Sequence, residues 1–154
     1  MSRINVGIIY GGKSTEHEVS VRSAESVFEA LNKDKYQVSL IYITKAGVWR
    51  LADEHNEIIS LDETNSKKIS VEPSNGLVAE GSIIELDTVL PILHGTAGED
   101  GSLQGLLELA GIPYAGCNVR SSAVCMDKDM TKRLLKLEGI SVAPSILLNY
   151  YNKD

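Results

Sequence analysis

The sequence predicts an α/β fold built on an open parallel sheet with helices on its faces. Nearly continuous apolar runs, such as residues 4–10 and 88–93, are typical of strands that are buried on both faces. Residues 18–31 carry apolar side chains at helical spacing, and glycine-rich turns separate the two kinds of segment. Strands that alternate with helices favour a parallel sheet, in which ligands collect beyond the carboxyl ends of the strands.

The predicted elements follow one another along the whole chain. Strands are expected at residues 4–10, 36–44, 48–51, 88–93, 112–116 and 140–148, and helices at about residues 18–31, 102–110 and 121–138. The turn at residues 45–47 indicates a hairpin. The polar stretch from Asp53 to Gly81 has no sustained period beyond short strand-like pieces such as residues 57–61, so an irregular excursion is predicted there. Ser102 is positioned to cap the second helix, and Gly111 to end it.

The composition excludes several classes of protein. A chain of 154 residues with 43% hydrophobic residues can form one globular core with at most a short appendage. The net charge of −6, with lysine and arginine dispersed, argues against a nucleic-acid partner. No apolar run approaches the length of a membrane span, and Met1 leads directly into a strand, which indicates a cytoplasmic protein. Cys117 and Cys125 are too isolated for a disulfide framework or a zinc site, and we expect reduced packing residues.

Residues 7–14 match the expression GxxxxGK[ST] of phosphate-binding loops letter for letter. The match is physically poor, because residues 8–10 continue the buried strand where such a loop would turn its amides toward phosphate. Glu16 and Glu18 would also bring two negative charges to the helix amino terminus that should receive the polyanion. We therefore interpret these residues as strand and turn.

Two loops at strand ends carry polar residues suited to a small ligand. The carboxylate of Glu16, beside a glycine turn, is suited to an ammonium group, and the alternative is a favourable interaction with the helix dipole. His94 can donate to a carboxylate, or a neighbouring carbonyl can satisfy it. Glu99 and Asp100 either cap the following helix or anchor a ligand. His17 is expected to support the site or to lie on the surface.

Four segments resemble the D-alanine-D-alanine ligases in order and spacing. They are residues 11–20 (GGKSTEHEVS), 94–105 (HGTAGEDGSLQG), 112–116 (IPYAG) and 122–128 (SAVCMDK). The resemblance covers the whole chain and implies a Rossmann-like, pre-ATP-grasp substrate domain over residues 1–118. Residues 119–154 would begin the central ATP-grasp domain. Because family members continue through further domains, the chain is expected to be an amino-terminal fragment that is inactive alone.

In this family, ATP phosphorylates the carboxylate of one D-alanine, and the amine of a second D-alanine attacks the acyl phosphate. The resemblance implies that Glu16 holds the ammonium of the first D-alanine, with the Val19 backbone near it. It implies that His94 lies against the carboxyl or acyl-phosphate end, and that Lys128 reaches ATP phosphate. The parent would use ATP and Mg²⁺ or Mn²⁺ and form a homodimer in the cytoplasm. The fragment itself is expected to hold no metal ligands and to bind no cofactor.

Two alternatives stay open. Ala97 stands where many family members have an aromatic or other larger residue. The related ligases of glycopeptide-resistant bacteria, which join D-alanine to D-serine or D-lactate, share the four segments. The other class is a freestanding, non-catalytic α/β binding module.

Overall fold

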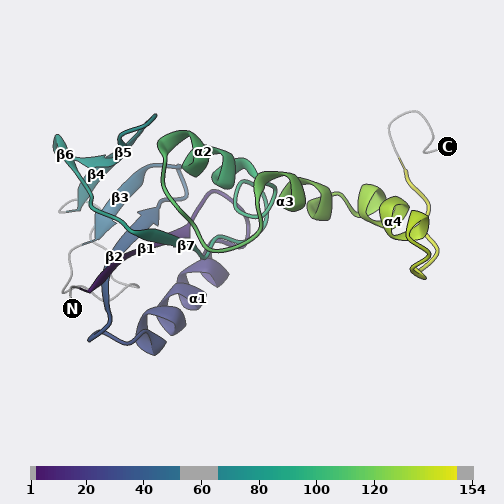
Figure 1. Cartoon of the computed structure of the whole chain (residues 1–154), viewed down its shortest axis with the longest axis horizontal. Coiled ribbons are helices and arrows are strands. Elements are labelled where there is room, and N and C mark those ends of the chain that lie inside the picture. Colours follow the sequence, from purple (N-terminus) through teal and green to yellow (C-terminus); the bar gives the residue numbers. More distant parts are fainter. Residues whose placement is uncertain (1–2, 53–65, 149–154) are drawn as a thin grey trace.

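The computed structural model describes residues 3–52 and 66–148. Within them, seven strands form one sheet in the order β6-β5-β4-β3-β2-β1-β7 (Figure 1). In chain order the elements are β1 (Ile4–Gly11), α1 (His17–Ala30), β2 (Tyr36–Ile43), β3 (Trp49–Ala52), β4 (Lys67–Glu72), β5 (Gly76–Ala79), β6 (Ser82–Ile83), β7 (Thr88–Pro91), α2 (Ser102–Ala110), α3 (Val119–Met126) and α4 (Lys128–Leu137).

The centre of the sheet is parallel, as the sequence predicts. β1 pairs with β2 along its whole length, and with β7 on its other side, where Val6 lies opposite Thr88. α1 joins β1 to β2 and so forms the crossover that parallel strands require. A strand is predicted at residues 112–116. Only one isolated parallel bridge, between Tyr114 and Val89, forms there. The predicted α/β class is confirmed.

The other half of the sheet is antiparallel. β3 pairs with β2 through the predicted hairpin, and β4, β5 and β6 follow as antiparallel neighbours. The prediction of an irregular excursion is therefore wrong for residues 67–79. The turn between β4 and β5 is residues 73–75, because Glu72 pairs with Gly76, and Ser74 and Gly76 have positive φ values of 64° and 85°. Residues 57–61, predicted as strand-like, lie outside the described residues.

The sheet separates two apolar clusters. Ile8 and Tyr10 pack with Ala24 of α1 on one face, whereas Ile9 packs with Leu107 of α2 on the other. This division follows from the alternation of side chains along a strand. All five side chains have 0% exposure. The two helices thus cover opposite faces and fix β1 between them (Figure 1).

The helix predicted at residues 121–138 is divided into α3 and α4. Asp127 separates them, because its carboxylate accepts the backbone N–H groups of Asp129 (3.0 Å) and Met130 (2.9 Å) and caps α4. α4 packs mainly against α3 and projects away from the sheet (Figure 1). No residue of α4 is buried.

The strand predicted at residues 140–148 is absent from the described chain, so that prediction is wrong. Ile146 is 87% exposed, and a strand needs a neighbour to pair its backbone groups. Cys117 and Cys125 are free, as expected, but both are exposed and are not packing residues. None of the helices described here combines the length and apolar character of a membrane span.

Candidate functional site

The loops after β1 and β7 meet at the carboxyl edge of the sheet, and Ser14 joins them. Its hydroxyl donates to the carbonyl oxygen of His94 (2.8 Å) and accepts the backbone N–H of Glu16 (3.1 Å). The structure thus brings together the two loops that the sequence selects. Ser14 was missed as a site residue, although a serine in the turn just before a helix is a recognised hydrogen-bonding signal.

Glu16 immediately precedes α1 and lies against Gly95 of the second loop. A side chain at position 95 would collide with Glu16 Oε2, and Gly95 has a φ of 72°, which other residues rarely adopt. The Glu16 side chain is exposed and makes no capping hydrogen bond to α1. The Glu16 carboxylate therefore does not cap α1 through a hydrogen bond, although it lies near the amino terminus, where a negative charge interacts favourably with the helix dipole.

The imidazole of His94 is held between α1 and its own loop. Nε2 lies 3.2 Å from Ser23 Oγ, and Nδ1 lies 3.9 Å from Glu99 Oε1. The ring is half-buried, with a side-chain exposure of 32%. The partners of the ring are thus the side chains of Ser23 and Glu99, and not a backbone carbonyl as the sequence also allowed. Because Ser23 belongs to α1 and Glu99 to the second loop, both segments fix the orientation of the ring.

Glu99 and Asp100 hold the second loop in shape. Glu99 accepts the backbone N–H of Gly95 (2.9 Å), and Asp100 accepts those of Ala97 (2.9 Å) and Ser102 (3.0 Å). The N–H group of Ala97 is the main reason that the pKa of Asp100 lies below its ordinary value. The prediction that Ser102 caps α2 is wrong: Ser102 is the first helical residue, and the Asp100 carboxylate accepts its N–H.

His17 and Ser20 support the first loop from the interior. His17 is only 4% exposed, and its Nδ1 and Nε2 lie 2.6 Å from the Gly12 carbonyl oxygen and 3.1 Å from Tyr42 Oη. Ser20 accepts the N–H of Gly11 (2.8 Å) and donates to the Ile92 carbonyl (2.6 Å). A surface position for His17 is therefore excluded.

Val19 lies in the first turn of α1, where backbone N–H groups lack intrahelical acceptors. Glu16, Val19 and His94 therefore gather around one end of α1. Lys128 does not join them, because it is exposed at the start of α4, which projects away from the sheet (Figure 1). Lys132, one helical turn further, lines the same shallow hollow as Lys128.

The phosphate-loop match is ruled out by the pairing of β1. Gly7, where such a loop would leave the strand, pairs with Ser39 on one side and Val89 on the other. Residues 8–10 continue the buried strand as predicted, each with 0% exposure.

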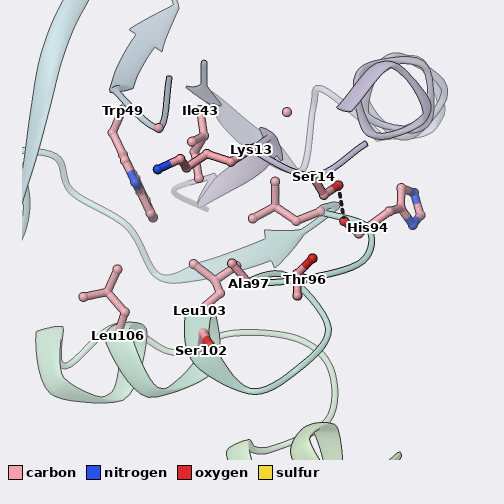
Figure 2. A pocket seen from close by; sticks show the side chains of 14 residues that line it. Lys13, Ser14, Ile43, Trp49, His94, Thr96, Ala97, Ser102, Leu103 and Leu106 are labelled. Atoms are coloured by element: carbon pink, nitrogen blue, oxygen red, sulfur yellow. Dashed lines mark hydrogen bonds between the residues drawn. The ribbon is translucent and has the colours of Figure 1, made fainter. Parts of the chain in front are cut away.

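Beside the two loops lies a cavity of about 220 Å³ (Figure 2). Its walls come from the ends of β1 and β2, from both loops and from α2. Across residues 3–52 and 66–148, no group of three or more histidine, cysteine, aspartate or glutamate side chains is placed to hold a metal ion.

Comparisons with known proteins agree with this geometry. A family model described as the D-ala D-ala ligase N-terminus matches residues 5–117. D-alanine-D-alanine ligase A of Escherichia coli (strain K12) is 41% identical over 168 residues, which cover 99% of this chain and 46% of that protein. The D-alanine-D-alanine ligase of Shouchella clausii is 44% identical over 169 residues, covering 100% and 45%. The chain thus spans about half the length of the curated relatives it matches.

Two solved structures show the same fold. The D-alanine-D-alanine ligase from Coxiella burnetii has a TM-score of 0.86 and 38% identity, covering 94% of this chain and 44% of that chain. The VanG D-Ala:D-Ser ligase from Enterococcus faecalis has a TM-score of 0.87 and 40% identity, covering 99% and 47%.

Proposed function

The chain belongs to the D-alanine-D-alanine ligase family, and from that membership we propose that it is the amino-terminal part of an ATP-dependent ligase that makes D-alanyl-D-alanine for peptidoglycan. One structural observation carries the proposal: Glu16, Val19 and His94 gather at one end of α1, on loops that Ser14 ties together. Catalysis would belong to the longer protein, of which this chain supplies the substrate-binding part.

Glu16 is the proposed partner of the ammonium group of the first D-alanine. Its carboxylate is exposed and makes no capping hydrogen bond, and the absence of a side chain at Gly95 leaves room for it. The Val19 N–H, in the open first turn of the helix, would face the same substrate. An exposed carboxylate without a hydrogen bond to its own helix is available to pair with a cation.

His94 is the proposed partner of the carboxyl or acyl-phosphate end of that D-alanine. Glu99 and Ser23 orient its ring, and either nitrogen can donate to an oxyanion once its present contact is exchanged for substrate. The Ser14 hydrogen bond fixes the spacing of the two loops. Glu16 and His94 would therefore hold the ammonium and carboxyl ends of D-alanine at a fixed separation. A substrate held in a fixed position reacts faster, because less freedom of motion is lost on the way to the transition state.

In the proposed reaction, a carboxylate oxygen of the first D-alanine attacks the terminal phosphorus of ATP, and ADP leaves. The amine of the second D-alanine then attacks the acyl carbon, phosphate leaves, and the amine loses a proton. Lys128 would contact ATP phosphate, with Lys132 one turn away. Asp127 already accepts the free N–H groups at the start of α4, so the lysine side chains would supply this contact.

Among the described residues, no group of three or more histidine, cysteine, aspartate or glutamate side chains is placed to hold Mg²⁺ or Mn²⁺. Phosphoryl transfer depends on positioning and on metal electrostatics, and we propose that this chain alone is inactive. Residues 1–118 would be the substrate domain and residues 119–154 the beginning of the ATP-grasp domain, which accords with the separation of α4 from the sheet. We place the parent in the cytoplasm, as a homodimer.

A second candidate is a ligase that joins D-alanine to D-serine or D-lactate. The VanG D-Ala:D-Ser ligase resembles this chain as closely as the D-alanine-D-alanine ligases do, with 40% identity over 99% of the chain. Dipeptide formation by the full-length protein with D-alanine, D-serine and D-lactate as competing second substrates would separate the two candidates.

The substrate role of Glu16 is tested by Glu16→Gln in the full-length protein. If the carboxylate pairs with the substrate ammonium in a closed site, kcat/KM for D-alanine should fall by about 2 to 4 kcal/mol, roughly 30-fold to 900-fold. A helix-dipole role would instead cost about 1 kcal/mol of stability and leave turnover unchanged.

Glu18→Gln is the matched control, because Glu18 lies on the same helical turn but pairs with Lys45 at 2.7 Å on the outer surface. It should leave kcat/KM at the wild-type value. A lowered melting temperature with unchanged kinetics in Glu16→Gln would assign Glu16 to structure and contradict the proposal.

A further inference from the structure

The cavity beside β1 and β2 combines an apolar wall with one lysine (Figure 2). Six apolar side chains contribute to the wall: Ile43, Trp49, Leu93, Ala97, Leu103 and Leu106. We propose that it is a binding site for a small carboxylate with an apolar body, in which the Lys13 ammonium pairs with the carboxylate. This function is independent of the proposed ligase reaction.

Lys13 is the residue that gave the phosphate-loop match, and the ligase reaction leaves it without a role. Its carbon chain lies over Gly47, where an added Cβ would meet Lys13 Cδ at 2.8 Å. In Figure 2 the chain extends along the cavity toward Trp49. Among the ion pairs of the described residues, none includes Lys13, so its charge is available to an anion beside the apolar wall.

The cavity is distinct from the proposed D-alanine site. Glu16 does not line it, and the His94 imidazole points away from it (Figure 2), toward Ser23 at 3.2 Å. The two sites share only the loop residues Ser14 and His94. D-Alanine would also fit poorly, because no carboxylate among the described residues lines the cavity to pair with its ammonium and its methyl group would fill little of the apolar wall.

Size and chemistry narrow the class of ligand. An apolar cavity of about 150 Å³ accommodates benzene, so 220 Å³ leaves room for one ring and a short acid chain. A phosphate group is disfavoured, because β1 stays a paired strand through Gly11 and offers no curved run of free amides. An aryl or branched aliphatic monocarboxylate fits both the wall and the single cation.

Trp49 makes the proposal directly measurable, since it is the only tryptophan of the 154 residues and it lines the cavity. We would titrate this chain with sodium 3-phenylpropionate at constant ionic strength and follow tryptophan fluorescence. A saturable change at millimolar concentrations is expected. The neutral 3-phenylpropionamide should bind at least ten-fold more weakly, because it lacks the charge that pairs with Lys13.

Two variants test the two halves of the site, with circular dichroism to confirm folding. Lys13→Met should weaken 3-phenylpropionate binding at least ten-fold. Leu106→Asp, which places a like charge in the wall, should abolish it. Lys68→Met is the matched control, because Lys68 is an exposed lysine on β4 outside the cavity, and it should bind as the wild type does.

The proposal would be overturned by the absence of a saturable signal, by equal affinity for the acid and the amide, or by unchanged affinity in a folded Lys13→Met variant. Displacement of 3-phenylpropionate by D-alanine would assign the cavity to the substrate site and would overturn it as well.

Discussion

Three short polar side chains, Ser14, Glu99 and Asp100, shape the two loops of the candidate site. Each accepts a backbone N–H of its own loop, and Ser14 also donates to the His94 carbonyl 80 residues away. A carboxylate that holds loop amides contributes to a site without touching the ligand, since it fixes where the loop backbone lies.

Asp100→Asn should reveal this role through pH. The pKa of Asp100 is lowered in the folded chain, so its stabilising effect is fully present above the ordinary value of 3.8 and is lost as the pH falls through the lower folded pKa. Asparagine has one side-chain oxygen, so it can accept only one of the two N–H groups, of Ala97 and Ser102, that the two Asp100 oxygens accept. We expect a loss of about 1 kcal/mol at pH 7 and a smaller difference near pH 2.

Urea unfolding of both proteins at the two pH values measures this difference. Asp34→Asn is the control, because Asp34 is an exposed carboxylate outside the site, and it should show little change at either pH. A stability difference that stays constant with pH would contradict the assignment.

For single residues, the sequence predicts which side chains belong to the site better than it predicts which partners they contact. Glu16 and His94 can be selected because each stands at the end of an apolar run. The Ser23 partner of His94 could not be predicted, because it lies 71 positions away and depends on how α1 packs against the sheet. The direction of the His94 ring, and hence its separation from the cavity, depends on the same packing.

At the scale of elements, β1 and α1 form the unit that positions the site. Two buried side chains, His17 and Ser20, hold the glycine turn between them. Glu16, just before α1, and Glu18, in its first turn, also oppose a polyanion at the amino terminus of this helix.

The isolated chain should therefore not bind ATP or GTP with Mg²⁺ through residues 7–14. Isothermal calorimetry is expected to show no micromolar affinity for either nucleotide. A micromolar affinity that Lys13→Ala abolishes would mean that the strand opens into a phosphate loop, contrary to its pairing with β2 and β7.

Periodicity predicts the apolar elements that face the core, misses the polar strands, and also predicts a strand at residues 140–148 that does not form. β1 and α1 are predicted because their side chains face a core. β4 lies in a polar stretch, and only Ile69 of its six residues is buried, so its strand pattern is weak. The break at Asp127 carries the signal of a helix cap, which a continuous helical period conceals.

At the scale of the whole molecule, α1 and α2 cover the centre of the sheet, whereas none of residues 128–148, the carboxyl-terminal arm, is buried. Leu137 is 81% exposed, and Met130, Leu134 and Ile140 are 40%, 43% and 52% exposed. Three of these apolar side chains lie on α4, which buries none of its residues, and Ile140 follows it, so this exposed apolar surface is suited to contact with another protein surface.

This chain should therefore self-associate at tens of micromolar, through the arm, through the proposed dimer contact of the first domain, or through both. Sedimentation velocity over a concentration series measures the association. Leu134→Lys combined with Leu137→Lys should remove the part that depends on the arm. A monomer throughout that range would count against both contacts.

The position of β1 between β2 and β7 also bears on how the chain emerges during synthesis. Its partners in β2 lie 32 positions downstream, from Ile4 to Tyr36, whereas those in β7 lie 82 positions downstream, from Val6 to Thr88. The ribosome needs roughly 2 to 10 seconds to add the residues between the end of β2 and the end of β7 at 5 to 20 residues per second. For that interval the nascent chain presents an apolar strand with one unpaired edge, open to other nascent chains and to chaperones.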